Sequence, residues 1–250
     1  MKGLIKWGAI AALVLAGILV VFAYARTLNK TELEFLIHIN EELVQQSVFG
    51  ESPTFAIWLE DPGSGETYTV FATRRVATGD WEGKKDVPMA LPVWSEVNQA
   101  ELIRESGKVQ EVLDDIIATG ATPLPGYFRS RVRIEPGSHW ICWIEMNLAG
   151  DFNESYPQYD PLTMIEDEFS TGQPAILYRV EIEANKDNAV IPVIPVVQGM
   201  CLVSEEGQAV VSPLAGITTA SAVFDELSIT VVSPKPRIIE KTTLEIPGDN

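Results

Sequence analysis

The stretch FAIWLEDPGSGETYTVFAT, residues 55–73, decides the fold class of this chain. Two runs rich in aromatic and β-branched residues flank Asp61-Pro62-Gly63-Ser64-Gly65, a segment of turn-forming residues. This pattern predicts a β-hairpin. Trp58 and Phe71 then lie in the two strands, where rings of this size pack into a core or across the strand pair.

Similar runs lie on either side of this hairpin. Leu33 to Ile39 alternate in polarity, which favours a half-buried strand, with a helix over the same residues as the alternative. Residues 127–134, YFRSRVRI, alternate arginine with apolar or small residues, and the turn at residues 135–138 leads into HWICWIEMNL. We expect a second hairpin there.

Further strand-like runs are AILYRVEIEA (175–184), residues 189–203 and LSITVV (227–232). Many short strands separated by Pro/Gly turns predict an all-β protein, and we expect an immunoglobulin-like β-sandwich. Residues 77–95 show no clear period and are expected to form a long ordered loop. Apolar residues at helical spacing in residues 109–117 predict a short amphipathic helix that ends at Gly120 and Pro123.

The N-terminal segment determines the compartment. Residues 7–25 carry no charge, and two lysines precede them, which predicts a transmembrane anchor with the body on the extracytoplasmic side. A cleaved signal peptide is the alternative, because Ala23-Tyr24-Ala25 has the small-x-small form of a cleavage site. We therefore divide the chain into the anchor or signal peptide (1–26), an extracytoplasmic domain (27–235) and a flexible tail (236–250).

The charge balance narrows the range of partners. The formal net charge is -17, from 35 acidic and 18 basic residues. Nucleic acid is an unfavourable partner, because its binding depends on cations that neutralise phosphates. Anionic lipid head groups are unfavourable for the same reason. A cationic partner, a metal ion or solubility alone fits such a balance.

The order of several short motifs resembles an uncharacterised family of exported bacterial β-sandwich domains. The motifs are FAIWLED, YTVFATR, LPVWSEV and TGATPLPG, and the similarity covers residues 55–126, with a weaker continuation to Glu145. The family shows VWIED, LPxW and TGATP segments in this order. The resemblance implies a sandwich fold and an envelope location, and it implies no known activity. This chain departs from the family in the insertion AGDFNESYPQYDP and in a longer C-terminal half.

Cys142 and Cys201 are the only cysteines. In an oxidising compartment they either form a disulfide, which closes a loop of about 60 residues and contributes roughly 4 kcal/mol, or stay buried as free thiols. Both alternatives stay open. A catalytic thiol is not expected, because neither His38 nor His139 is a convincing partner base.

Thr119-Gly120-Ala121-Thr122 resembles the motif at which flavin mononucleotide is attached to threonine in exported electron-transfer proteins. The resemblance implies covalent FMN at Thr119 or Thr122 and an accessory role in electron transfer. The family motif has an aspartate six positions before the modified threonine, where this chain has Ile116. The alternative is that Gly120 only ends a helix.

Asp151, Asn153 and Asp160 are candidate calcium ligands, because calcium prefers several oxygen ligands at close spacing. No EF-hand spacing is present, and a solvated acidic loop is the alternative. Tyr156, Tyr159 and Trp140 nearby could form an aromatic platform for a ligand or serve in packing.

The sequence offers little for catalysis. HExxH, GxSxG and metal-ligand cysteine pairs are absent, although a glycosidase-type pair of carboxylates that hydrolyses envelope glycans is conceivable. We expect a non-enzymatic binding or assembly module of the cell envelope that contacts a protein partner. The alternative function is the flavin-dependent accessory role.

Overall fold

The computed structural model describes residues 2–28, 30–78, 90–106, 119–120, 123–184, 192–236 and 244–245. The helices are α1 (Lys2–Thr27), α2 (Glu41–Gln46), α3 (Arg74–Thr78), α4 (Pro92–Ser106) and the 3-10 turn η1 (Ala220–Ala222). The strands are β1 (Thr31–Ile39), β2 (Thr54–Glu60), β3 (Thr67–Thr73), β4 (Thr119–Gly120), β5 (Gly126–Ile134), β6 (His139–Asn147), β7 (Tyr159–Asp160), β8 (Ile165–Glu166), β9 (Ala175–Glu183), β10 (Val196–Val203), β11 (Ala209–Ser212), β12 (Phe224–Val232) and β13 (Leu244–Glu245).

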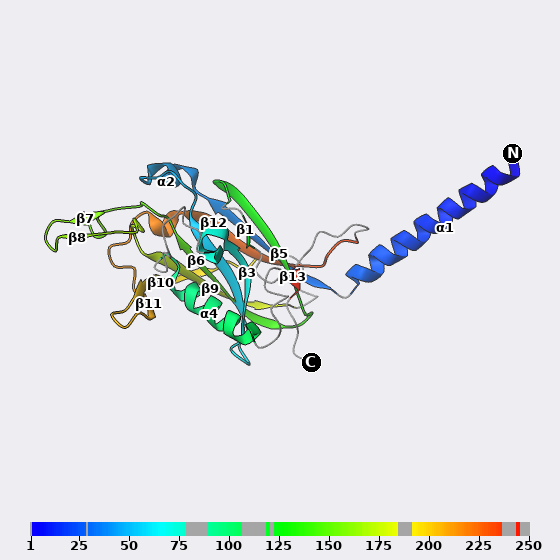
Figure 1. The fold of residues 1–250 in the computed structure, drawn as a ribbon. Helices are drawn as coiled ribbons and strands as arrows, with labels where there is room; N and C mark the ends of the chain where they lie inside the picture. Colours follow the sequence, from blue (N-terminus) through cyan, green and yellow to red (C-terminus); the bar gives the residue numbers. More distant parts are fainter. Residues whose placement is uncertain are drawn as a thin grey trace.

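Two sheets carry most of these strands (Figure 1). The four-stranded sheet has the order β12-β1-β5-β13, and the seven-stranded sheet has the order β11-β10-β9-β6-β2-β3-β4. Apart from the short parallel pairs that β4 and β13 form, every ladder in these two sheets is antiparallel. The expectation of a mostly β fold is confirmed, and the arrangement is compatible with a β-sandwich.

The two sheets share one apolar core. Phe55 of β2 lies at its centre, and its ring centroid is 5.1 Å from that of Phe71, 5.2 Å from Phe128 and 5.4 Å from Phe224. Phe71 belongs to the same sheet as Phe55, whereas Phe128 and Phe224 come from the other sheet. The contacts of Phe55 with Phe128 and Phe224 are edge-to-face, an arrangement that stabilises beyond the apolar area that it buries.

The hairpin predicted from residues 55–73 is confirmed as β2 and β3, which pair antiparallel. The strand at Leu33 to Ile39 is confirmed as β1, so the helical alternative is wrong. It is the central partner of both β5 and β12, and its residues Leu33, Phe35 and Ile37 are fully buried. The strand runs at residues 175–184 and 227–232 are confirmed as β9 and β12.

The second predicted hairpin is wrong. Both strands exist, but β5 pairs with β1 and β13, while β6 pairs with β2 and β9 in the other sheet. The turn between them is a corner that connects the two sheets. Gly137, at φ +81°, donates its N–H to Ala184 O at 2.7 Å, and Ala184 returns an N–H to Ser138 O at 2.8 Å. These bonds fix the corner to the end of β9, so the chain cannot fold back on β5.

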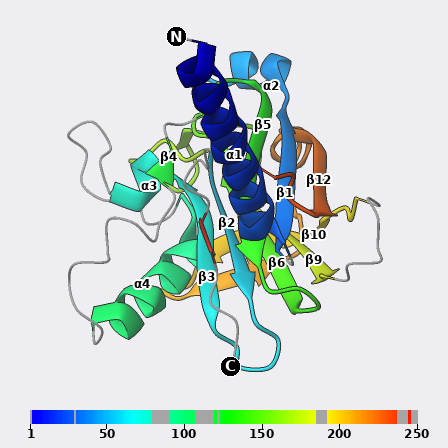
Figure 2. The same cartoon turned by 90° about the vertical axis from the view of Figure 1, so that its right-hand side faces the viewer.

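Helix α4 covers the other face of the seven-stranded sheet (Figure 2). It contacts β3 on one side and β10 and β11 on the other, above a second apolar core that includes Trp58, Trp94 and Leu177. Part of the loop expected at residues 77–95 is therefore wrong, because α4 begins at Pro92, a residue well suited to the first helical position. Residues 79–89 and the helix expected at 109–117 lie outside the described residues.

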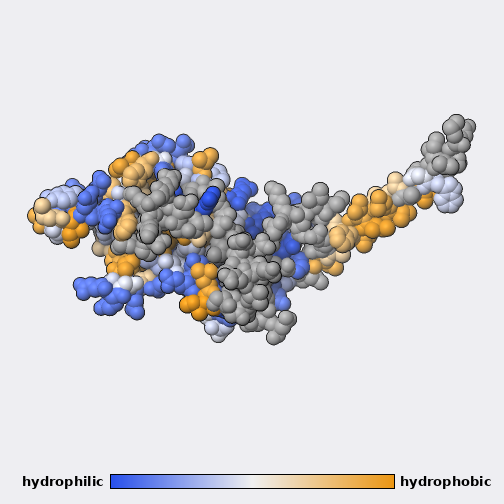
Figure 3. Space-filling model, in the orientation of Figure 1, coloured by the Kyte–Doolittle hydropathy of each residue, from blue (hydrophilic) through white to orange (hydrophobic). Residues whose placement is uncertain are grey.

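Helix α1 extends from one end of the body (Figure 1). Its described side chains are largely apolar and exposed, as Figure 3 shows in orange, and Trp7, Leu13 and Val21 are more than two-thirds exposed. Among the residues that the structure describes, none of the helices combines the length and the apolar character that crossing a membrane requires. The anchor and the cleaved signal peptide both stay predictions.

At the C-terminus, Leu244–Glu245 form β13, which pairs with Val132 and Arg133 of β5. This pairing differs from the flexible tail expected at residues 236–250, at least for these two residues. Residues 237–243 and 246–250 lie outside the described residues.

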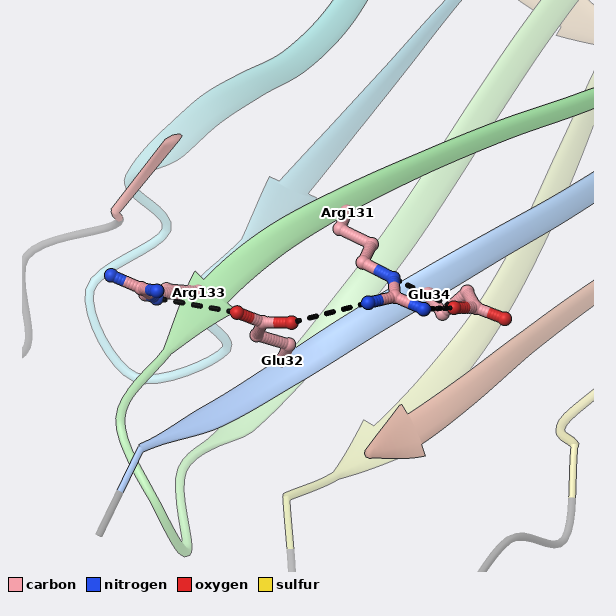
Figure 4. Close-up of polar contacts among 4 residues, drawn as sticks. All are labelled: Glu32, Glu34, Arg131 and Arg133. Carbon is pink, nitrogen blue, oxygen red and sulfur yellow. Dashed lines mark hydrogen bonds and ion pairs between the residues drawn. The ribbon is translucent and has the colours of Figure 1, made fainter. Parts of the chain in front are cut away.

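A ladder of charged side chains joins the first half of β1, which follows α1 in the chain, to β5 (Figure 4). Arg133 Nε lies 3.3 Å from Glu32 Oε1, and Arg131 Nη1 lies 3.9 Å from Glu32 Oε2. Arg131 also donates from Nε to Glu34 Oε2 at 2.7 Å. Glu32 is fully buried and Glu34 is partly exposed, although both lie on one strand. The loss of Glu32 should therefore cost more folding stability than the loss of Glu34.

We expect Glu32→Ala to lower the free energy of unfolding of the full chain by about 3 kcal/mol, because it breaks a buried ion pair with Arg133 by removing one of the two charges. Glu34→Ala is the matched control and should cost less than about 1 kcal/mol, because its ion pair is solvated. Urea denaturation monitored by tryptophan fluorescence measures both. Equal losses would contradict the assignment of Glu32 as the buried member of the ladder.

Candidate functional site

The acidic insertion noted in the sequence forms an arm, defined here as residues 151–173, between β6 and β9. It contains six acidic residues and no lysine or arginine. The short hairpin of β7 and β8 lies at its far end, and in Figure 1 the arm and α1 extend from opposite ends of the body.

The base of the arm is fixed by a network around Asp151. This residue is only 8% exposed. Its carboxylate accepts hydrogen bonds from Thr219 Oγ1 at 2.7 and 2.8 Å and from Gln173 Nε2 at 2.8 Å. Gln173 in turn accepts from the backbone N–H of Thr218 at 2.7 Å. Burial raises the pKa of Asp151, and the bonds from Thr219 and Gln173 oppose that rise.

Side chains along the arm shape its turns. Asn153 Oδ1 accepts from the backbone N–H groups of Ser155 at 2.9 Å and Tyr156 at 2.8 Å. Asp167 Oδ2 accepts from the N–H of Gly172 at 2.8 Å. Such Asx contacts replace backbone hydrogen bonds and order a loop that has little secondary structure.

Asp160 orders the tip of the arm in the same way. Its Oδ1 accepts from the N–H of Leu162 at 2.8 Å, and its Oδ2 accepts from the Thr163 hydroxyl at 2.8 Å. The pKa of Asp160 is lowered, first by the hydrogen bond from Thr163 and then by that from Leu162. Met164 donates its N–H to Asp160 O at 2.8 Å and adopts φ +58°, which is uncommon for a residue with a side chain.

These contacts bear on the predicted calcium ligands. In Asp151, Asn153 and Asp160 the side-chain oxygens already accept hydrogen bonds from the protein. Within the described part of the chain, no cluster of three or more His, Cys, Asp or Glu side chains is arranged to hold a metal ion. Calcium binding stays a prediction without further support.

The aromatic platform does not form as suggested. Trp140 is 4% exposed and packs edge-to-face against Tyr68 in the core between the sheets. Tyr156, near the base of the arm, donates its hydroxyl to Ala215 O at 2.8 Å and packs against the core. Only Tyr159 lies near the tip, where its hydroxyl contacts Met164 Sδ at 3.0 Å.

The tip itself is apolar and exposed. Leu162 is 92% exposed, Met164 72% and Ile165 66%. Glu166 and Glu168 follow directly and are exposed as well. Exposed apolar residues on an ordered projection, away from the core, suggest a contact surface.

The disulfide alternative is wrong, because Cys142 and Cys201 are both free and buried. Cys142 on β6 belongs to the core between the sheets, and Cys201 on β10 belongs to the core under α4. The two side chains therefore lie on opposite faces of one sheet, with β9 between their strands. Strands two places apart are separated by about 9 to 10 Å, beyond the ~7 Å that a bridge spans between Cα atoms. Burial raises the pKa of both thiols.

The structure does not test the prediction that flavin is attached at Thr119 or Thr122. Thr119 lies in β4, paired with Ala72 at the edge of the large sheet, and Thr122 lies outside the described residues. Covalent FMN at either threonine stays a prediction.

Sequence reasoning missed Glu145, a fully buried residue of β6 whose carboxyl group contacts the first turn of α4. Its two oxygens accept from the backbone N–H groups of Val93 at 3.2 Å and Trp94 at 2.6 Å. The residues before the helix, Ala90 and Leu91, have no side chain that could cap it, so Glu145 supplies the cap from β6. Burial raises the pKa of Glu145 to about 7, although bonds from Trp94, Cys201 and Val93 favour the ionised form. In the sequence, the absence of a capping residue before Pro92 was the signal that a distant side chain caps this helix.

No family model matches this chain, and no curated protein or solved structure matches it either. The resemblance to exported β-sandwich domains accordingly stays a prediction. The arm is the feature of this structure that best fits a contact function.

Replacing Asp151 tests whether the arm is held rigidly. Asp151→Ala removes the acceptor for both Thr219 and Gln173, and we expect a loss of roughly 2 kcal/mol of local stability. Backbone amides of the arm should then exchange with deuterium about 30-fold faster. Glu154→Ala, at an exposed position of the same arm, is the control and should leave exchange unchanged. Unaltered exchange in Asp151→Ala would contradict the proposed role of the network.

The raised pKa of Glu145 predicts a specific pH dependence. Between pH 4.5 and about 7 the folded protein keeps a proton that the unfolded chain has lost, so the free energy of unfolding falls as pH rises. At about 1.4 kcal/mol per pH unit, the total fall is about 3 kcal/mol. Glu145→Gln should remove this contribution, whereas Glu205→Gln at an exposed site should keep it. Denaturation series at several pH values measure the difference, and parallel profiles for wild type and Glu145→Gln would count against it.

Proposed function

We propose that this protein is a non-catalytic binding or assembly module of the cell envelope, located on the extracytoplasmic side of the membrane. In this proposal the body is an immunoglobulin-like β-sandwich. It stays near the membrane through residues 7–25, or is released if that segment is cleaved. The arm makes contact with a protein partner.

The observation that carries the proposal is the rigid arm with an exposed apolar tip. Hydrogen bonds order the arm at its base through Asp151 and at its tip through Asp160. Order in the free state reduces the entropy that is lost on binding, so a rigid projection suits recognition. The three most exposed apolar residues of the arm are Leu162, Met164 and Ile165, and none of them is buried in the core of the protein.

The position of α1 supports the same function. Helix α1, whose residues 7–25 carry no charge, and the arm extend from opposite ends of the body (Figure 1). If α1 inserts in a bilayer, the arm points away from the lipid surface. The acidic character of the arm also disfavours contact with anionic head groups.

The test compares the size of the complex with and without the arm. In the variant, residues 154–170 are replaced by a short Gly-Ser linker, and the full chain is extracted from its native membranes in mild detergent. We expect the wild-type chain to migrate in a complex larger than the chain alone and the variant to migrate alone, with equal melting temperatures. A linker in place of residues 205–207, in the exposed turn between β10 and β11, is the control and should keep the complex.

Two outcomes would contradict the proposal. The wild-type chain could migrate alone, which would argue against a stable partner. The complex could also persist without the arm, which would place the contact elsewhere on the body. Protease added to intact cells tests the compartment, because cleavage within the arm is expected only if the arm lies outside the cytoplasmic membrane.

A further inference from the structure

The chemistry of the arm specifies the partner more closely. The tip carries three exposed apolar side chains, Leu162, Met164 and Ile165, in and directly after the turn that Asp160 orders. In Figure 3 this end of the molecule shows hydrophobic residues in orange next to hydrophilic residues in blue. Two carboxylates that follow the tip in the chain, Glu166 and Glu168, are exposed.

The tip is pre-formed. Asp160 binds the N–H of Leu162 and the hydroxyl of Thr163, and its own carbonyl accepts from Met164. These bonds hold Met164 at φ +58°, a conformation that costs energy for a residue with a side chain. Strained, ordered and exposed apolar residues serve no purpose in the packing of this domain, and such features concentrate at contact sites.

The charge around the tip distinguishes between the possible binding partners: an anionic bilayer, a second copy of the chain and another protein. Several carboxylates of the arm are used in turns, but Glu154, Glu166 and Glu168 are exposed, and the arm has no basic residue. An anionic bilayer would repel this surface. A second copy of the chain, with 35 acidic and 18 basic residues, would be repelled as well. A protein surface with positive charge around an apolar pocket is complementary to it.

We infer that Leu162, Met164 and Ile165 insert as an anchor into an apolar pocket of a partner protein, and that lysine or arginine side chains on the rim of this pocket pair with Glu166 and Glu168. This inference rests on the proposed function and names the chemistry of its partner. An apolar core surrounded by a polar rim is the usual anatomy of a protein–protein interface. The charged rim steers the approach, and the apolar contact determines the lifetime of the complex.

Site-specific photo-crosslinking tests the inference in the native cell. Leu162 of the full chain is replaced with p-benzoylphenylalanine, which keeps the tip apolar, and cells are irradiated. The adduct is purified, and the cross-linked peptide of the partner is sequenced by mass spectrometry. We expect an adduct with a different protein, at a peptide that contains apolar residues and a net positive charge.

Charge reversal tests the rim. The pair Glu166→Lys with Glu168→Lys should lower the yield of the adduct at least about tenfold, because like charges then meet. The pair Glu205→Lys with Glu206→Lys changes the net charge equally at an exposed turn elsewhere and should leave the yield within about twofold. Ile165→Asp should lower the yield as strongly as the first pair, whereas Leu124→Asp, at another exposed leucine, should not.

Several results would overturn the inference. They are an adduct with lipid, an adduct of twice the chain mass, a cross-linked peptide that is neutral or acidic, and a yield that charge reversal at Glu166 and Glu168 does not change. The same probe at Leu124 separates this inference from the proposed function. Adducts at Leu124 without adducts at Leu162 would leave a binding module whose contact is not the tip. Adducts at neither position would contradict both.

Discussion

The structure depends on the burial of strand β2 on both faces. Phe55, Ile57 and Leu59 point into the core shared with the four-stranded sheet, while Ala56 and Trp58 point into the core beneath α4. A strand that is apolar on both sides requires a cover on both sides. The rings around Phe55 bring the second sheet onto one face, and α4 covers the other.

The cover provided by α4 has an electrostatic cost. The helix begins without a capping residue of its own, so its first N–H groups bind Glu145, a carboxyl buried in the middle of the large sheet. Removing this group from water disfavours its charge, while the helix N-terminus favours that charge. Burial prevails, because the pKa of Glu145 rises to about 7. The docking of α4 is therefore coupled to the protonation of a residue that has no contact with solvent.

The arm shows how acidic residues can order a loop. Its carboxylates at Asp151, Asp160 and Asp167 accept hydrogen bonds from neighbouring donors and replace secondary structure in a segment that has little. The same residues that suggest a cation site in the sequence thus give the arm its shape. The exposed charges that remain, together with the apolar tip, form a surface that the rest of the fold does not require.

The sequence by itself determined the local elements. Alternation of polarity and Pro/Gly turns identified the hairpin of β2 and β3 and the strand β1, because side chains of a half-buried strand repeat with a period of two. Beyond this hairpin, it did not determine which strands pair. The corner at Gly137 and the separation of Cys142 from Cys201 depend on which sheet each strand joins, and that is decided by contacts between residues distant in the chain. The cap of α4 was hidden for the same reason, since Glu145 lies about fifty residues from the N–H groups that it binds. Tertiary structure also decided that Asp151 orders the base of the arm, because its donors Gln173 and Thr219 are distant from it in the chain.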